Sequence, residues 1–384
     1  MSENNADSWP AKWFSEFAPG GFAITGECFQ GKPPAASLPE LLQLLQIDAD
    51  RMRPFARELV AHANDQPSVL GPLLDLVRGI RAYLQFQDIM SIVVDPATPL
   101  ENRHYCYYES IVYLREAVVC WLDGNVLAAL TILRPLLELS ILHCYWKTRC
   151  EDSTYETYYA WLEGKGRKPG FAVGLAYVFE RIPAMQRVGP VRSDKLQRGL
   201  TQAYAALCAY NHTPLLSESV AAASGAVDGI SLEMFLYALH MLNALLRQLV
   251  YLYILVYPMS LFPVDGTTKF GFSGPVGLFF DRCNFALLED FIGHRDTSRL
   301  AGLLRSLPEV MSLTKWFEDM RRLSTEEIEA DWHKVERERE LRLPEDAGAS
   351  TAQAVMIQRL AADKAHYRAL RWALNYVNPP SSGE

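Results

Sequence analysis

The chain places an arginine and a glutamate inside an otherwise apolar stretch, LTILRPLLELSILHCYW, at residues 130–146. Arg134 and Glu138 are spaced so that, on an α-helix, their side chains share one face and can form an ion pair. Pro135 between them has no backbone N–H, which leaves the Thr131 carbonyl free to accept from another donor. Because both faces of this helix are apolar, we expect both charges to be buried as a polar cluster in a helical core.

Two interpretations of this pair remain open. A buried ion pair can fix the register of a helix without any chemistry of its own. Alternatively, Arg134 could line a site for an anion or a nucleotide, because perturbed charges in clefts are enriched at functional sites.

A second group of polar residues stands where a predicted helix ends, in CAYNHTPLL at residues 208–216. A histidine at a helix C-terminus, such as His212, is favoured by the helix dipole and titrates near neutral pH. Asn211 readily adopts the left-handed conformation that ends helices. His212 could cap the last carbonyls of the helix, or it could act as a general acid or base, with Tyr210 and Asn211 as ligand-binding neighbours.

The apolar R-x-x-x-E helix followed by a Tyr-x-His turn resembles a bacterial family of helical proteins of unknown function that is related to HEPN domains. Several of its members are linked to abortive infection or toxin systems. The matching positions are Arg134, Glu138, Tyr210 and His212, and the resemblance covers about residues 100–260. It implies an α-helical bundle that could be dimeric and could act in stress or phage defence.

The same resemblance implies, at most, a metal-independent ribonuclease or nucleotide-processing enzyme. In that reading His212 is the acid–base group, Arg134 binds phosphate and Glu138 holds Arg134. HEPN ribonucleases carry an R-x(4–6)-H motif on one helix, and this spacing occurs here at Arg57 and His62 and at Arg359 and His366, as often as chance predicts. Arg134 and His212 lie on different predicted helices, so they could meet only through the fold.

The elements that must position these residues are predicted to be α-helices, because apolar residues recur at helical spacing. The predicted helices span 37–63, 68–93, 99–123, 126–146, 152–164, 172–182, 191–210, 231–257, 281–292, 296–320, 324–342 and 350–377. Ser37 with Glu40, and Ser324 with Glu327, have the spacing of capping boxes. The DGN sequence at 123–125 is suited to close a helical hairpin. The stretch 262–280 could form a small β-hairpin or an ordered loop.

These elements predict an all-α fold, a large multi-helix bundle. We expect an irregular N-terminal arm at 1–36, a helical bundle core at 37–292, and a C-terminal helical segment at 293–384 packed on or extending the core. The apolar runs at 126–146 and 249–257 are interpreted as buried helices and not as membrane spans. Arg and Glu at the centre of a span would each cost about 2.5–3.5 kcal/mol.

Composition excludes several classes of function. The net charge is -8 and the pI is near 5.6, so no global basic field exists, double-stranded DNA is not an expected partner, and any phosphate contact needs a local patch. The seven cysteines form no C-x-x-C pair and no signal peptide is evident, which favours a reducing cytoplasm. No H-x-x-x-H or H-E-x-x-H spacing occurs, so we expect no metal and no cofactor.

The leading hypothesis from the sequence is a noncatalytic helical interaction or effector protein that contacts a second copy of itself or another protein. The alternative is the HEPN-type enzyme acting on RNA or a nucleotide. A third class, a helical sensor of a small apolar or anionic ligand, would suit the many aromatic residues.

Overall fold

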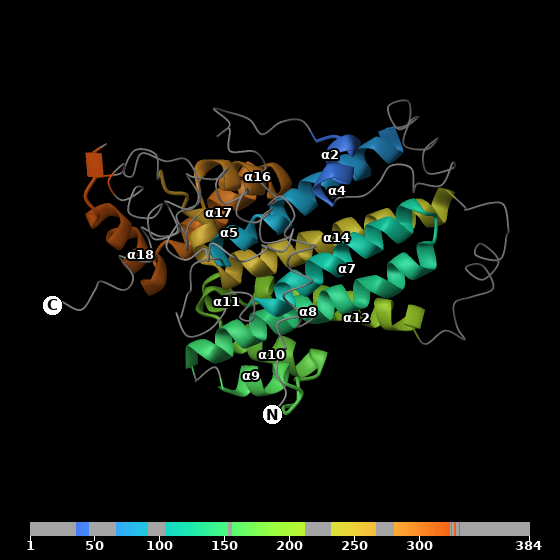
Figure 1. Cartoon of the computed structure of the whole chain (residues 1–384), viewed down its shortest axis with the longest axis horizontal. Helices are drawn as coiled ribbons and strands as arrows, with labels where there is room; N and C mark the ends of the chain where they lie inside the picture. Colours follow the sequence, from blue (N-terminus) through green and yellow to red (C-terminus); the bar gives the residue numbers. More distant parts are fainter. Residues whose placement is uncertain are drawn as a thin grey trace, which may run out of the picture.

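A computed structural model of the chain describes residues 36–45, 67–90, 104–152, 156–211, 232–265 and 280–322, together with 324, 326, 327 and 330. The regular elements in these ranges are helices, and no β-strand occurs among them (Figure 1). The predicted all-α, multi-helix fold is therefore confirmed.

The centre of the fold is a hairpin of two long helices, α7 (Tyr105–Leu122) and α8 (Val126–Asp152). Gly124 turns the chain with a φ of 73°, a left-handed value that glycine adopts at little cost. Asn125 donates its backbone N–H to the Cys120 carbonyl at 2.8 Å, and its side-chain oxygen accepts from the Ala128 N–H at 3.2 Å. The turn predicted at 123–125 is thus confirmed, and Asn125 caps the start of α8.

Helix α14 (Leu232–Val256) packs against both α8 and α4 (Pro67–Leu84). The Trp121 ring of α7 stacks on Phe235 of α14 at a centroid distance of 4.4 Å, and its indole N–H donates to the Phe235 carbonyl at 3.0 Å. Helices α2 (Leu38–Leu44) and α16 (Arg282–Ile292) cover α4, above the central helices in Figure 1. The apolar core lies among these helices.

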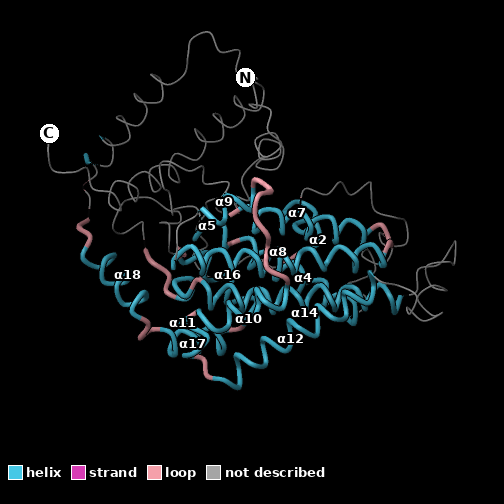
Figure 2. Tube along the Cα trace, turned by 90° about the horizontal axis from the view of Figure 1, so that it is seen from below, coloured by secondary structure: helices cyan, strands magenta, loops and turns pink. Residues whose placement is uncertain are grey.

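The opposite side of α8 is covered by α10 (Phe171–Arg181) and α12 (Pro190–Asn211), and rings of α9 (Glu156–Leu162) contact Trp146 near its end. The short helix α11 (Pro183–Arg187) connects α10 to α12 and packs on α12, α14 and α17 (His294–Leu304). Helices α11 and α12 each begin with a proline. An N–H in the first turn has no intrahelical acceptor, so the missing N–H of proline costs no hydrogen bond there. Both α10 and α12 pack on α8, and Figure 2 shows α12 along the lower edge of the described helices.

The remaining elements differ from the predicted boundaries. The predicted helix 68–93 is interrupted between α4 and α5 (Phe86–Met90). A short 3-10 helix, η3 (Pro258–Leu261), follows α14. The predicted helix 296–320 is two helices, α17 (His294–Leu304) and α18 (Pro308–Asp319), because Leu307 before the proline is extended with a ψ of 134°.

One of the two predicted capping boxes forms. The Glu327 N–H donates to the Ser324 hydroxyl oxygen at 3.2 Å, and the Ser324 N–H donates to the Glu327 carboxylate at 2.8 Å. The prediction at Ser37 is wrong, because that side chain makes no capping bond. The Glu40 carboxylate instead accepts two hydrogen bonds from the Arg81 guanidinium, whose side chain is 1% exposed.

Several predictions fall outside the described residues: the N-terminal arm up to residue 35, the second half of the helix predicted at 37–63, most of the helix predicted at 324–342, and the helix predicted at 350–377. Most of the stretch 262–280 also lies outside them. The Val264 N–H donates to the Phe280 carbonyl at 2.9 Å, which joins the two ends of that stretch. The domain boundaries stay predictions.

Two helices are long and apolar enough to cross a membrane, over Val126–Arg149 and Met234–Val256. More than half of the most apolar window in each, 56% and 61%, is buried inside this fold. The core helices of globular proteins have this character, in agreement with the interpretation of both runs as buried helices.

Candidate functional site

Arg134 and Glu138 form the ion pair predicted from their spacing. The Arg134 Nε donates to the Glu138 Oε1 at 2.9 Å. The side chains are 27% and 25% exposed, so the expectation of full burial is wrong. This flank of α8 contacts α12 through Tyr204 and the loop before α10 through Lys168, and solvent reaches the pair.

A tyrosine from α12 completes the arrangement around this pair. The Tyr204 hydroxyl donates to the Glu138 Oε1 at 3.1 Å and accepts from the Arg134 Nη2 at 3.4 Å. The Arg134 guanidinium carbon also lies 5.4 Å from the centre of the Tyr204 ring. The Lys168 ammonium is 3.6 Å from the second oxygen of Glu138. The Glu138 carboxylate is therefore compensated by two cations and one hydroxyl.

The first residue of α10 locks this tyrosine in place. The Phe171 and Tyr204 rings are parallel within 7°, with their centres 3.9 Å apart. We call Arg134, Glu138, Lys168, Phe171 and Tyr204 the Arg134 cluster. It ties α8, the start of α10 and the middle of α12 together.

The ionisation states in the cluster follow from these contacts. The hydrogen bond to Glu138 raises the pKa of Arg134, against the opposing effect of burial. Burial raises the pKa of Tyr204, and a hydrogen bond with Cys208 and the negative charge of Glu138 act in the same direction. At neutral pH Arg134 is thus a cation and Tyr204 a neutral hydroxyl, which makes Tyr204 a donor to Glu138 and not a base.

The other predicted site residues do not join this cluster. The Tyr210 hydroxyl lies 2.6 Å from the Tyr237 hydroxyl of α14. Burial raises the pKa of Tyr210, and so does its hydrogen bond to Tyr237. Tyr210 follows Tyr204 by about 9 Å along α12 and is directed to a different neighbour.

Asn211 is the last residue of α12, and its side chain lies outside the described part. His212 also lies outside it. The proposal that His212 meets Arg134 therefore stays a prediction.

Sequence reasoning missed four residues of this region: Lys168, Phe171, Tyr204 and Cys208. Tyr204 and Cys208 are one helical turn apart, which marks a packed face of α12 but names no partner helix. Lys168 belongs to the loop GKGRKPG at 164–170, which reads as a solvent-exposed loop. The Lys168 side chain is 57% exposed and still reaches Glu138, so only the fold reveals the contact.

A separate polar network is sealed inside the core, between α4, α7 and α8. The Tyr83 hydroxyl lies 2.6 Å from the Ser110 hydroxyl and 3.0 Å from that of Ser140. The Tyr107 hydroxyl donates to the Tyr83 carbonyl at 2.8 Å and to the Leu84 carbonyl at 3.2 Å, at the end of α4. These bonds satisfy buried polar groups and fix how the helices meet.

His143 of α8 extends the buried polar interior toward α14. Its Nε2 is 2.7 Å from the Tyr257 hydroxyl, and its ring stacks on Tyr253. Burial lowers the pKa of His143 well below its usual range, and the positive charges of His104 and Lys147 add to the effect. The ring is 2% exposed, so it is a neutral structural group with no access for a substrate.

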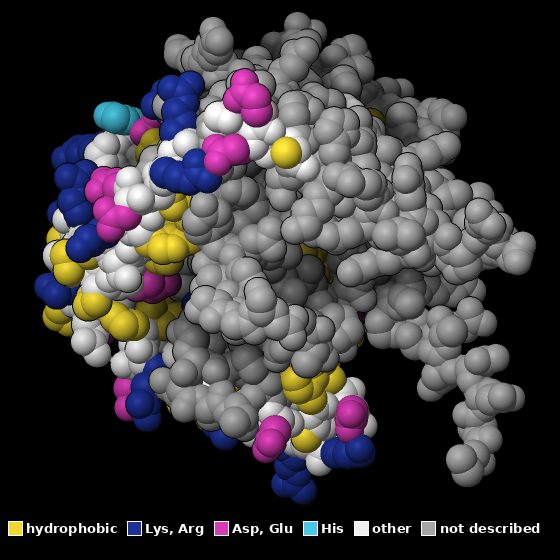
Figure 3. Space-filling model, turned by 60° about the vertical axis from the view of Figure 1, so that its left-hand side comes forward, with side chains coloured by type: hydrophobic (Ala, Val, Ile, Leu, Met, Phe, Trp, Pro, Cys, Tyr) yellow, Lys and Arg dark blue, Asp and Glu magenta, His cyan; other side chains and the backbone are white. Residues whose placement is uncertain are grey.

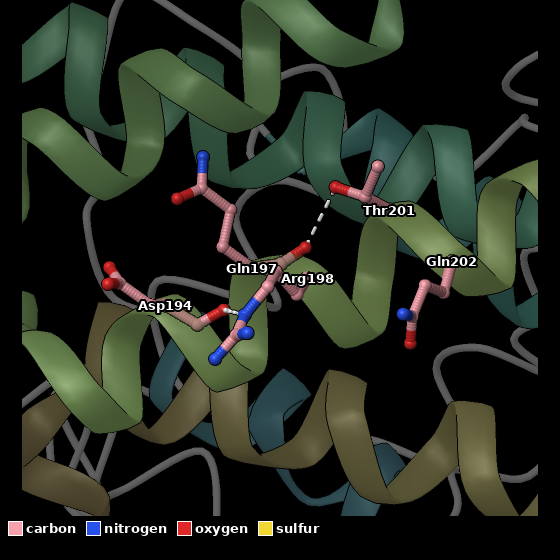
Figure 4. A pocket seen from close by; sticks show the side chains of 5 residues that line it. All are labelled: Asp194, Gln197, Arg198, Thr201 and Gln202. Carbon is pink, nitrogen blue, oxygen red and sulfur yellow. Dashed lines mark hydrogen bonds between the residues drawn. The ribbon is translucent and has the colours of Figure 1, made fainter.

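The surface also carries a shallow, open hollow on the outer side of α12 (Figure 4). It is lined by side chains of this helix: Asp194, Gln197, Arg198, Thr201 and Gln202. The Arg198 Nε and the Thr201 hydroxyl donate to carbonyls one turn earlier on the same helix, at 3.2 and 2.8 Å. The lining includes neither a nucleophile paired with a base nor a set of metal ligands, so it is suited to contact and not to chemistry.

No family model, no curated protein and no solved structure matches this chain. The resemblance to the HEPN-related family therefore stays a prediction. Among the residues that the structure describes, no group of three or more His, Cys, Asp or Glu side chains could hold a metal ion.

Proposed function

We propose that this chain is a noncatalytic interaction protein that binds a negatively charged partner. The contact surface is the basic face, which we define as residues 163–198: the loop before α10, then α10, α11 and the first turns of α12. One observation carries the proposal. This segment has eight Lys and Arg against three Asp and Glu, in a chain whose net charge is -8.

The cations of the basic face are at the surface. Lys165, Arg167, Lys168, Arg181, Arg187, Lys195 and Arg198 are exposed, and Arg192 is half-buried. The segment 281–322, by contrast, has seven residues of each sign. Among the described side chains that are visible in Figure 3, basic and acidic ones are interspersed. A local excess of one sign steers and orients an oppositely charged partner.

The Arg134 cluster supports this role as a structural clamp. It holds α10 and α12 on α8, so the basic face is organised before a partner arrives, which lowers the entropic cost of binding. The cluster gives no support to a ribonuclease. Two nitrogens of Arg134 already bond Glu138 and Tyr204, and the Glu138 carboxylate would repel a substrate phosphate.

Charge reversal on the basic face tests the proposal. The face variant carries Arg187→Glu, Lys195→Glu and Arg198→Glu. The matched control carries Arg295→Glu, Arg299→Glu and Arg305→Glu, which are exposed residues on and just after α17. Both variants change the net charge by the same amount, so a general charge effect would appear in both.

The measurement is affinity capture from the source cells with quantitative mass spectrometry and RNA sequencing. We expect the wild-type chain and the control to recover the same acidic partner and the face variant to lose it. A partner set that is equal for all three proteins would rule out the basic face as the contact surface.

A further inference from the structure

We propose that the partner of the basic face is a protein segment that forms an acidic amphipathic helix and lies along α12. Its aliphatic side chains would contact Val191 and the uncharged part of α12, and its carboxylates would contact the flanking cations. This inference rests on the proposed function and adds the chemical class of the partner.

The outer side of α12 offers a continuous line for such a helix. Val191, Lys195, Arg198 and Gln202 follow one another by four, three and four positions, the spacing of one helix face. All four are exposed, and Val191 is 78% exposed. The line is about 16 Å long, or three helical turns, which a short partner helix can match.

After Arg198 the exposed side chains of α12 are uncharged, and most of them are small. The last charged residue of α12 is Arg198, and the exposed residues after it include Thr201, Ala205 and Ala209. The hollow of Figure 4 lies at the junction, where Arg198 and Gln202 line it together. Short side chains allow a second helix to approach closely, and Arg198 beside them places a cation at the edge of the contact.

Cations lie at both ends of the pair of helices α10 and α12. Phe171 at the start of α10 stacks on Tyr204 in the later half of α12, while α11 leads from the end of α10 back to the start of α12. The two helices are therefore antiparallel. Arg187 and Lys195 lie at one end of the pair, and Arg167 lies in the loop that enters α10 at the other. A helix with carboxylates toward both of its ends is the complement of this distribution.

Helix stability does not account for the cations at the start of α12. The N-terminal end of a helix carries a partial positive charge, so cations in the first turns are unfavourable there. Nevertheless α12 has Arg192 and Lys195 near its start and no acidic residue in its first turn. Asp194 is the one acidic residue in the first turns of α12, so Arg192, Lys195 and Arg198 leave an excess of cations that an external acidic group would balance.

The exposed apolar side chains of α10 and α12 favour a protein as the partner over single-stranded RNA. Exposed valines lie on both helices, Val173 at 66% on α10 and Val191 at 78% on α12. Proteins that bind single-stranded RNA present aromatic rings on which bases stack. The rings of Phe171 and Tyr204 stack on each other, so their inner faces are closed to a base.

A peptide selection with the full-length chain tests the inference. A displayed library of random 18-residue peptides is selected against the wild-type chain, and enriched peptides are synthesised and measured by fluorescence anisotropy at low and high salt. The proteins measured are the wild type, the face variant, the α17 control and Val191→Ser. A labelled 20-nucleotide single-stranded RNA is titrated in parallel, and circular dichroism confirms that each variant is folded.

We expect enriched peptides to combine Asp and Glu with aliphatic residues three or four positions apart. They should bind the wild type and the α17 control equally, the face variant at least tenfold more weakly, and Val191→Ser several-fold more weakly. High salt should weaken binding.

Peptides without acidic residues that lose affinity only with Val191→Ser would overturn this inference and leave the contact surface in place. RNA binding that the face variant abolishes, with no peptide enriched, would also overturn it while keeping the proposed function. Peptides that bind all four proteins equally, or no binding of either probe, would overturn both.

Discussion

Tyr204 bears on the stability of the chain through one hydroxyl group, which bridges Glu138 and Arg134. Tyr204→Phe keeps the ring stacked on Phe171 and removes the bridge. We expect the free energy of unfolding to fall by about 1 kcal/mol, the usual contribution of one hydrogen bond. Urea unfolding followed by circular dichroism measures this difference.

Tyr210→Phe is the matched control, because it removes a hydroxyl that bonds another tyrosine at the surface. Its effect on unfolding should be smaller. An equal loss in both variants would show that the hydroxyl of Tyr204 has no special part in the cluster.

The pair of Glu40 and Arg81 makes a contrasting prediction at the same scale. Glu40→Ala removes the carboxylate from a guanidinium whose side chain is 1% exposed, and it should cost about 3 kcal/mol in unfolding free energy. Glu163→Ala breaks a pair with Lys165 in which both side chains are mostly exposed, and it should cost almost nothing. Equal losses in thermal or urea unfolding would refute the burial argument.

The Arg134–Glu138 and Glu40–Arg81 ion pairs show which side-chain contacts can be predicted from a sequence. The pairing of Arg134 with Glu138 could be predicted because the two residues are one turn apart on one helix. The pairing of Glu40 with Arg81 could not, because it joins two helices and competes with a local capping motif at Ser37. Local spacing is visible in a sequence, whereas the partner of a helix face is decided by tertiary packing.

Elements were predicted better than their ends and their neighbours. Apolar periodicity identified α7, α8, α12 and α14 closely, since each buries a long apolar face. It missed the break at Pro308, because apolar residues continue on both sides of it. The order of the helices around α8 was not predictable, because a periodic stripe says that a helix is packed and not what it is packed on.

His143 of α8, which contacts Tyr257 just after α14, makes the free energy of unfolding depend on pH. Its pKa is lowered in the folded chain, while in the unfolded chain it takes up a proton below about pH 6.5. The unfolded state then binds more protons, so stability is complete above that pH and is lost as the pH falls below it. The loss approaches about 1.4 kcal/mol per pH unit for this one group.

His143→Gln should remove that dependence. Urea unfolding at pH 6.5 and 5.5 is suited to the comparison, because most carboxylates titrate at lower pH. A decline between these two pH values as steep in the variant as in the wild type would refute the assignment.

The net charge of the whole molecule does not show how its charged residues are distributed. The composition, with a net charge of -8, led to the expectation that any anion contact needs a local patch. The segment 163–198 has the local excess of cations that such a patch requires, and this excess can be counted in the sequence. That these cations are exposed, as Val173 and Val191 are, is a property of the fold.

The excess of cations on the basic face predicts how the chain is retained on an ion-exchange column. At pH 7 the chain should be retained weakly on a cation exchanger although its pI is near 5.6, because the basic face can turn toward the resin. The face variant should pass through at low salt. The α17 control should elute later than the face variant, and co-elution of the two would show that net charge alone governs retention.

The Phe171–Tyr204 stack attaches the start of α10 to the later half of α12, and the short connection through α11 attaches the end of α10 to the start of α12. Opening fluctuations of these two helices are consequently coupled, since neither can leave α8 without straining the other. Amide hydrogens along 171–211 should then exchange with solvent as one cooperative group. A ligand that bridges both helices would slow that exchange over the whole group, including amides that it never touches.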